Sequence, residues 1–323
     1  MSGPRGLLAI LGATATGKSA LAVALAERLG GEVVNADAFA VYRGLDAGTA
    51  KPTVEERRGI PHHLIDIREP WEPFTAGDFA RLARDAVREI LGRGRLPILC
   101  GGTGFYVRAF FEGLFEGPPR YEAVRDALRK VAERRGTTYL ARALSLLDPE
   151  SAVRVAPADA ARTIRYLEIG LRTGRRPSDL FRSRPVAALG TPSVRILLTL
   201  PRPVLYERIS ERFNRSIAKE LPREVRRILA SGVSASAPGF RAIGYRETAS
   251  FVEGGLPEPE WRDAVVRATR RFAKRQETWF RAEPELLPLD AGRPDLLEAA
   301  LAAARPLFDP SHSFPFPLEG SSR

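Results

Sequence analysis

Apolar residues in the first hundred positions occur in short continuous runs that alternate with amphipathic stretches. The apolar runs cover residues 7–11, 32–36, 63–67 and 96–100. Helical spacing covers 19–29 and 76–93, and another helix is expected from 104 to 110 or 111. Buried strands that alternate with helices are typical of a parallel sheet with crossover connections. We therefore predict an α/β fold with a parallel sheet and flanking helices.

The pattern changes after Pro118-Pro119. From 122 to about 184 it is helical and rich in Arg and Ala, with breaks at Pro149, Pro157 and Gly174. A β-like run returns at 194–200, followed by helices at 203–217 or beyond and at 258–282, and by a short strand at 286–289. The predicted units are an α/β core of 1–117 and 187–305, a helical insertion subdomain of 118–186, and a disordered tail of 306–323.

A glycine-bounded loop, Gly-Ala-Thr-Ala-Thr-Gly-Lys-Ser at 12–19, lies between the first apolar run and the first helix. Its glycines allow backbone N–H groups to turn inward, and the helix start adds partial positive charge, so the loop suits phosphates. Lys18 can reach the outer phosphates, and the Ser19 hydroxyl can ligate a Mg²⁺ ion. We predict a P-loop that binds a diphosphate or triphosphate through Gly12, Ala13, Thr14, Ala15, Thr16, Gly17, Lys18 and Ser19.

Two polar residues follow other strands of the predicted sheet. Asp37 comes directly after the second run, where a carboxylate can ligate Mg²⁺, accept a proton from a nucleophile, or cap the next turn. Thr103 lies in the loop Gly101-Gly-Thr-Gly104, where its hydroxyl can bind a ligand or cap the next helix. Because ligands of parallel sheets bind at the carboxyl ends of the strands, the loops at Gly12, Asp37 and Gly101 are expected to converge.

The chain is strongly basic, with 50 Lys and Arg, 39 Asp and Glu, and a net charge of +11. Such an excess favours a polyanionic partner, although solubility alone also explains it. Between 262 and 281 there are seven basic and two acidic residues, interleaved with Phe272, Trp279 and Phe280. Helical spacing places Val265, Thr269, Phe272, Gln276 and Trp279 on one face. The opposite, basic face can bind RNA or simply be solvated.

Composition excludes several other classes of protein. No stretch approaches the roughly 18 apolar residues of a membrane-spanning helix, and no signal-peptide pattern precedes the first strand, so a cytoplasmic protein is expected. The single cysteine, Cys100, excludes an internal disulfide and a cysteine-based zinc cluster. His62 and His63 have no third ligand at a suitable spacing, which argues against a metal site there.

Taken together, these segments resemble the tRNA dimethylallyltransferases, also called tRNA isopentenyltransferases, over about residues 6–290. Beyond the P-loop, the resemblance rests on 37–52, 61–66, 78–79, 101–106, 243–246 and 273–281. Two segments are more specific than the P-loop, which many nucleotide-binding proteins share. They are Gly-Thr-Ala-Lys-Pro at 48–52 and Ala-Lys-Arg-Gln-Glu-Thr-Trp at 273–279.

The resemblance implies transfer of a dimethylallyl group from dimethylallyl diphosphate to N6 of the adenosine 3′ of the anticodon, with Mg²⁺ and release of diphosphate. It assigns Asp37 as general base and Thr103 to placing the adenine and the reacting carbon. Arg212 is a further candidate for the diphosphate. The partner would be the anticodon stem-loop of tRNA, with the target base flipped out of its stack, and the enzyme is expected to be a monomer. The tRNA-binding candidates are Asp37, Ala38, Phe39, Ala40, Arg125, Arg162, Arg165, Arg241, Gly244, Tyr245, Arg246, Lys274 and Arg275.

Four positions depart from the family pattern. Ala38 and Ala40 stand where the family commonly has Ser and Gln, and Ala156 and Ala158 stand where it has His and Asn. The first pair, Ala38 and Ala40, removes hydrogen bonds that could orient the base or the flanking nucleotides. Two alternatives stay open: a P-loop kinase of a small metabolite or nucleotide, which leaves 48–52 and the basic helix unexplained, and a catalytically silent RNA-binding protein.

Overall fold

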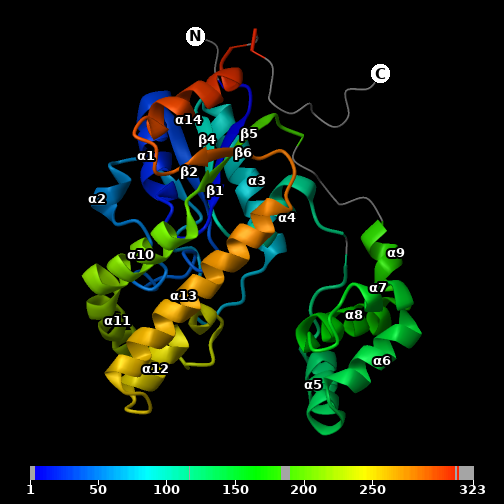
Figure 1. The fold of residues 1–323 in the computed structure, drawn as a ribbon. Coiled ribbons are helices and arrows are strands. Elements are labelled where there is room, and N and C mark those ends of the chain that lie inside the picture. Colours follow the sequence, from blue (N-terminus) through cyan, green and yellow to red (C-terminus); the bar gives the residue numbers. More distant parts are fainter. Residues whose placement is uncertain (1–3, 116, 183–189, 310, 313–323) are drawn as a thin grey trace, which may run out of the picture. The chain divides into compact units, whose positions relative to one another are not determined.

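The computed structural model describes residues 4–115, 117–182, 190–309 and 311–312 of the 323-residue chain (Figure 1). The chain divides into two compact units, Met1–Phe111 with Leu189–Arg323 and Glu112–Ala188. We call them the core unit and the helical unit, and each is described by itself.

In the described part of the core unit, six parallel strands form one sheet in the order β3-β2-β4-β1-β5-β6. Their bounds are β1 Leu7–Gly12, β2 Gly31–Ala36, β3 His62–His63, β4 Leu96–Gly101, β5 Ser193–Thr199 and β6 Leu287–Asp290. The central strands β1 and β4 are buried at every position, as their continuous apolar sequences predict. The predicted α/β class with a parallel sheet is confirmed.

The strand register brings the predicted loops to one edge of the sheet. Gly101 of β4 pairs with Leu11 of β1 on one side and with Ala36 of β2 on the other. Gly12 pairs with Leu198 of β5. The loops that follow Gly12, Ala36 and Gly101 therefore leave the sheet side by side.

One face of the sheet is covered by α1 (Lys18–Leu29) and α14 (Leu296–Ala304), which contact each other (Figure 1). Leu8 and Ile10 of β1 lie in one apolar cluster with Leu25 of α1 and Ala300 of α14. The helix α3 (Ala76–Gly92) packs against β2 and β4, and α4 (Gly104–Glu112) follows β4. The sheet is thereby covered along its central strands.

A second apolar cluster supports the loop that follows β2. It joins Tyr42 and Leu45 of that loop to Phe213, Tyr245 and Trp261. After α10 (Arg202–Arg212), the cluster takes in a π-helical turn η1 (Phe213–Ile217), α11 (Ala218–Ala230), a 3₁₀ turn η2 (Pro238–Arg241), α12 (Tyr245–Val252) and the long α13 (Glu258–Arg281). These elements are drawn from green to orange in Figure 1. The short α2 (Val54–Arg57) lies farther along the same loop. The loop that begins with Asp37 is thus packed on a core of its own.

Two expectations about local structure are wrong. The strand predicted at 63–67 is limited to His62–His63, because Leu64 and Asp66 have φ values of 63° and 56°, which break the extended backbone. The ordered chain also continues past residue 305. The 3₁₀ turn η3 (Arg305–Leu307) buries Leu307 completely, and the C=O of Leu307 accepts a hydrogen bond from the Arg5 N–H at 2.8 Å. The predicted tail at 313–323 lies outside the described residues.

The helical unit contains α5 (Glu122–Arg135), α6 (Thr137–Leu147), α7 (Pro149–Val153), α8 (Ala160–Thr173) and α9 (Pro177–Arg182). Pro149 begins α7, where its missing N–H costs nothing, and Gly174 ends α8 with a φ of 66°. The apolar core is small and centres on Leu140, Leu144, Val155, Ile164 and Leu167. No helix in the described parts of either unit is both long and apolar enough to span a bilayer.

Candidate active site at the carboxyl edge of the sheet

A cavity of about 1560 Å³ opens at the carboxyl edge of the sheet. It is lined by the loops that follow β1, β2 and β4, by the end of α10, and by one face of α13. Thr14, Asp37, Gly101, Arg212 and Gln276 represent these five elements. Every residue that lines the cavity belongs to the core unit.

The loop at 12–19 has the backbone of a phosphate-binding turn. Gly12, Ala15 and Gly17 have φ values of 144°, 65° and 91°. A Cβ atom on Gly12 would lie 2.6 Å from the Leu198 carbonyl oxygen, so only glycine fits there. Within the loop, Thr16 Oγ1 and Lys18 Nζ both donate to the Ala13 carbonyl oxygen, at 2.8 and 2.6 Å.

Positive charge is concentrated beside this loop. Burial, with a smaller contribution from Arg212, lowers the pKa of Lys18 from 10.5 to about 8, while Cys100 and Asp37 act in the opposite direction. Arg212 Nη2 donates to Thr14 Oγ1 at 3.0 Å, and burial lowers the pKa of Arg212 as well. Arg212 Nε is buried with no hydrogen-bond partner among the described residues. Two desolvated cations and an unused donor at a P-loop fit an anion.

Cys100 lies at the same edge as a nearly buried thiol. Burial raises its pKa to about 11, although Lys18 and Ser19 act in the opposite direction. The thiol is therefore neutral at physiological pH. It packs in the core as a small apolar group and has no character of a nucleophile.

Asp37 follows β2 and shapes the next turn. Its Oδ1 accepts the N–H groups of Phe39 and Ala40 at 2.8 and 3.2 Å, so the carboxylate does cap a turn. Both of these bonds use the same oxygen, which leaves Oδ2 for another partner. Asp37 also lines the cavity with the P-loop. Asp37 can therefore cap the turn through Oδ1 and still act on a ligand in the cavity through Oδ2.

Thr103 links two loops of the site. Its Oγ1 accepts a hydrogen bond from the Ala38 N–H at 3.1 Å, and its carbonyl oxygen accepts the N–H of Tyr106 at 2.9 Å in the first turn of α4. Thr103 therefore precedes α4 directly, but its hydroxyl oxygen holds the turn after Asp37 instead of capping the helix.

Gln276 belongs to the site, although the sequence analysis did not assign it there. The side chain is buried, its Oε1 accepts the Thr14 N–H at 2.9 Å, and its Nε2 donates to the Gly102 carbonyl oxygen at 2.8 Å. It thus joins the P-loop to the loop after β4. A Cβ atom on Gly102 would lie 2.7 Å from the Gly12 carbonyl oxygen and 2.3 Å from Gln276 Nε2, and the backbone contact requires glycine. Gln276 lies on the mainly apolar face of α13, and a buried glutamine needs hydrogen-bond partners, so its position was the sequence signal that could have indicated this role.

The tRNA-binding candidates of the core unit fall into two groups. Arg241, Arg246, Lys274 and Arg275 are exposed, and Phe39 and Ala40 line the cavity beside Asp37. Tyr245 is completely buried and its hydroxyl donates to Glu224, so its predicted contact with tRNA is corrected to a packing role. Gly244 is also buried, with a φ of 89° at the start of α12.

In the helical unit, Arg125 and Arg165 both pair with the buried Glu168, at 3.2 and 2.8 Å. Arg162 is half exposed and lies 3.7 Å from Asp159. Two of the three candidate arginines therefore have a buried acidic partner. Their contact with tRNA stays a prediction.

Comparison with known proteins identifies close relatives along nearly the whole chain. Residues 40–283 match the family model "IPP transferase". The tRNA dimethylallyltransferase of Koribacter versatilis is 44% identical over 280 residues, which cover 87% of this chain and 91% of that protein. That of Solibacter usitatus is 46% identical over 298 residues, 91% of this chain and 96% of that protein.

Solved structures agree with this result. The tRNA isopentenylpyrophosphate transferase of Bacillus halodurans superposes with a TM-score of 0.69 at 36% identity, covering 96% of this chain and all of that one. A eukaryotic dimethylallyltransferase acting on tRNA superposes with a TM-score of 0.73 at 24% identity, covering 92% of this chain and 77% of that one, which supports the fold.

Proposed function

The chain belongs to the IPP transferase family, and we propose that it transfers a dimethylallyl group from dimethylallyl diphosphate to N6 of the adenosine 3′ of the anticodon in tRNA. It is an enzyme of tRNA modification, as its relatives are named, and these relatives do not favour a small-molecule kinase or a silent RNA-binding protein. The observation that carries the proposal is that the P-loop, Asp37 and Arg212 line one cavity.

The diphosphate of the donor is expected to bind in the turn at 12–19. Lys18 belongs to this turn and Arg212 donates to Thr14 of the same turn, so both can supply positive charge where the C–O bond of the donor breaks. The Ser19 hydroxyl lines the cavity at the start of α1, so it fits as a ligand of Mg²⁺. When bound, this ion supplies further positive charge to the leaving diphosphate.

Asp37 is expected to act as the general base. N6 of the adenine forms a bond to C1 of the dimethylallyl group, the C1–O bond breaks, and the bonding electrons leave with the diphosphate. The proton of N6 goes to the carboxylate through Oδ2, because Oδ1 already accepts two backbone N–H groups. Thr103 holds the turn that follows Asp37 through the Ala38 N–H, and we expect it to help place the adenine and the reacting carbon.

The alanines at 38 and 40 keep the backbone part of this turn. Ala38 N–H donates to Thr103 Oγ1, and Ala40 N–H donates to Asp37 Oδ1. The alanines in place of the family's Ser and Gln therefore leave the Asp37 carboxylate supported by the backbone, and we expect the enzyme to be active. The net charge of +11 and the exposed basic side of α13 favour the tRNA partner. We place the enzyme in the cytoplasm as a monomer.

Label transfer tests this proposal. Purified protein is incubated with unmodified tRNA, Mg²⁺ and either radiolabelled dimethylallyl diphosphate or radiolabelled ATP. Transfer of label from the prenyl donor to tRNA is expected. Turnover of ATP alone would instead support a kinase, and tight tRNA binding without transfer would support a silent binder.

The variant Asp37→Asn tests the role of the base. Asparagine keeps an oxygen for the N–H groups of Phe39 and Ala40 but accepts no proton, so kcat is expected to fall at least about 100-fold. The Kd for tRNA should stay within about tenfold, measured by filter binding. An Asp37→Asn enzyme as fast as the wild type would remove Asp37 from this role.

A further inference from the structure

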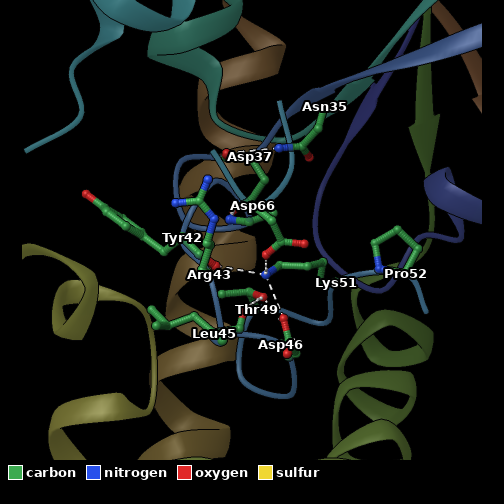
Figure 2. A network of polar contacts seen from close by, with 12 residues as sticks. Asn35, Asp37, Tyr42, Arg43, Leu45, Asp46, Thr49, Lys51, Pro52 and Asp66 are labelled. Carbon is green, nitrogen blue, oxygen red and sulfur yellow. Dashed lines mark hydrogen bonds and ion pairs between the residues drawn. The ribbon is translucent and has the colours of Figure 1, made fainter. Parts of the chain in front are cut away.

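Lys51 is a buried cation in the loop that begins with Asp37. Its side chain is 3% exposed, and its Nζ donates to the Tyr42 carbonyl oxygen at 2.8 Å and to Asp46 Oδ1 and Asp66 Oδ1 at 2.6 Å each. Figure 2 shows Lys51 pointing toward these three acceptors. An ammonium group has three N–H donors, so its hydrogen-bonding capacity is filled.

The three acceptors belong to two different segments. Tyr42 and Asp46 lie in the loop after β2, whereas Asp66 lies in the segment after β3. The same two segments are joined by backbone hydrogen bonds, from the Ile67 N–H to the Val41 carbonyl oxygen and from the Arg43 N–H to the Arg68 carbonyl oxygen, both at 2.8 Å. Lys51 therefore closes the loop that begins at Asp37 onto its neighbour.

Asp37 is attached to the same neighbouring segment. Asn35 Nδ2 donates to the Asp37 carbonyl oxygen at 3.3 Å and to the Leu64 carbonyl oxygen at 3.1 Å. Leu64 and Asp66 both have positive φ values, a backbone form that is costly for such residues and persists only where contacts enforce it. The Lys51–Asp66 ion pair is one such contact.

A second buried group holds the far side of the loop. Glu224 Oε2 accepts the N–H groups of Asp46 and Ala47 at 2.9 and 2.8 Å, and Tyr245 donates to the other oxygen of this carboxylate. Asp46 is thereby fixed through its backbone by Glu224 and through its side chain by Lys51. The loop has little freedom between Asp37 and Lys51.

The exposure of the two aspartates indicates what removal of Lys51 would do. The side chains of Asp46 and Asp66 are 54% and 41% exposed, so without the ammonium group both carboxylates can turn into water. The two like charges would then separate, and the two segments would lose their buried side-chain link, although the exposed Arg43–Glu69 pair would remain. Loosening of the loop is expected before loss of the fold.

We propose that Lys51 is a positioning residue that fixes the Asp37 carboxylate for proton abstraction by tying its loop to the segment after β3. The proposal rests on the proposed function, in which Asp37 is the base. Lys51 does not touch the reacting atoms in this scheme. In this proposal its effect on the rate passes through Asp37.

A double-mutant cycle tests this dependence by single-turnover label transfer. Lys51→Met is expected to lower the rate about 10- to 100-fold, with Kd for dimethylallyl diphosphate within about threefold because the P-loop is untouched. In the Asp37→Asn background, Lys51→Met should change the residual rate less than twofold. Arg43→Met is the matched control, because the exposed Arg43–Glu69 pair joins the same two segments, and it should stay within about twofold of wild type.

The outcomes separate the two ideas. An Asp37→Asn enzyme with wild-type rate would contradict the base assignment. Two results would overturn the positioning role if Asp37→Asn is slow. In the first, Lys51→Met is as fast as the wild type. In the second, Lys51→Met lowers the rate by the same factor in the wild-type and Asp37→Asn backgrounds. If Lys51→Met fails to bind pyrophosphate, Asp66→Ala decides in its place, since it leaves Lys51 paired with Asp46 and Tyr42. Its expected loss is about fivefold or more, again absent in the Asp37→Asn background.

Discussion

The core unit and the helical unit both bury charged side chains, but these side chains stabilise different things. In the core unit, large apolar clusters stabilise the sheet and helices, and Lys51 and Glu224 fix a loop at the edge of the cavity. In the helical unit, the apolar core is small, and the carboxylates of Asp148 and Glu168 are completely buried between helices. Lys51 and Glu224 thus support the site of the core unit, whereas Asp148 and Glu168 support the fold of the helical unit.

The contacts of the two carboxylates in the helical unit support this distinction. Glu168 accepts the Tyr121 N–H at 2.6 Å besides its two arginines, and Asp148 accepts the N–H groups of Ser151 and Ser178 at 3.1 and 2.7 Å. Burial alone would raise the pKa of Asp148, but these hydrogen bonds outweigh it and lower that pKa to about 2. Both groups are charged and partnered at neutral pH, as buried carboxylates must be.

The largest expected effect is therefore in the helical unit. Glu168→Ala leaves Arg125 and Arg165 without their buried partner, which should cost about 3–5 kcal/mol of the free energy of unfolding of this unit. Trypsin digestion at increasing urea concentration would measure the unfolding of the helical unit, because trypsin cleaves after arginine and the unit is rich in arginine. Pyrophosphate binding by the core unit should not change.

Glu150→Ala provides the control for this experiment. Glu150 also pairs with two arginines, Arg154 and Arg182, but its side chain is 39% exposed, so the loss should be below about 1 kcal/mol. Equal protection of the two variants from trypsin would mean that the buried pairs of the helical unit contribute no more than exposed ones. The contrast between the two units would then fail.

A smaller effect is expected from pH at the core unit. The pKa of Lys18 is lowered to about 8, so its charge is present below that pH and is lost above it. A bound anion favours the charged form, so the affinity for pyrophosphate should fall about tenfold between pH 7 and pH 9. Isothermal titration calorimetry with pyrophosphate between pH 7 and pH 9 would measure this affinity.

Lys18→Arg is the matched variant, because a guanidinium group stays charged throughout this range. It should remove most of the pH dependence that the wild type shows, while the ionisation of pyrophosphate itself affects both proteins alike. A wild-type affinity that does not change between pH 7 and pH 9 would show that the desolvation of Lys18 has no consequence for binding.

Features of the structure could be predicted from the sequence where the interacting residues lie close together along the chain. The P-loop depends on glycines and on its flanking strand and helix, all within about twenty residues, so its pattern is visible in the sequence. The strands were predicted from continuous apolar runs. The failure at 63–67 arose because Leu64 and Asp66 adopt positive φ, which no residue type there signals.

Other parts of the site depend on contacts between distant segments. Gln276 reaches Thr14 and Gly102 across the cavity, and Glu224 reaches Asp46, so neither is visible from local spacing. Tyr245 lies in a motif between a buried glycine and an exposed arginine, and only the packing shows that its ring is inside. Likewise the sequence counts Arg165 as surface charge, although it is paired with Glu168.

The smallest expected effect concerns the exposed charge of the core unit. Lys274 and Arg275 lie on the basic side of α13, and Arg275 stacks over Phe272 with its guanidinium carbon 5.7 Å from the ring centre. The double variant Lys274→Ala/Arg275→Ala should weaken tRNA binding severalfold at low salt and reduce the slope of log K against log salt by about one per lost phosphate contact. The rate at saturating tRNA should not change, because neither residue lines the cavity.

Arg267→Ala is the control on the same helix, since Arg267 is already paired with Asp263 at 3.4 Å and attracts phosphate less. Equal salt slopes for the double variant and the wild type would mean that the exposed charge of α13 only solvates the helix, and tRNA affinity would then have to come from other basic residues.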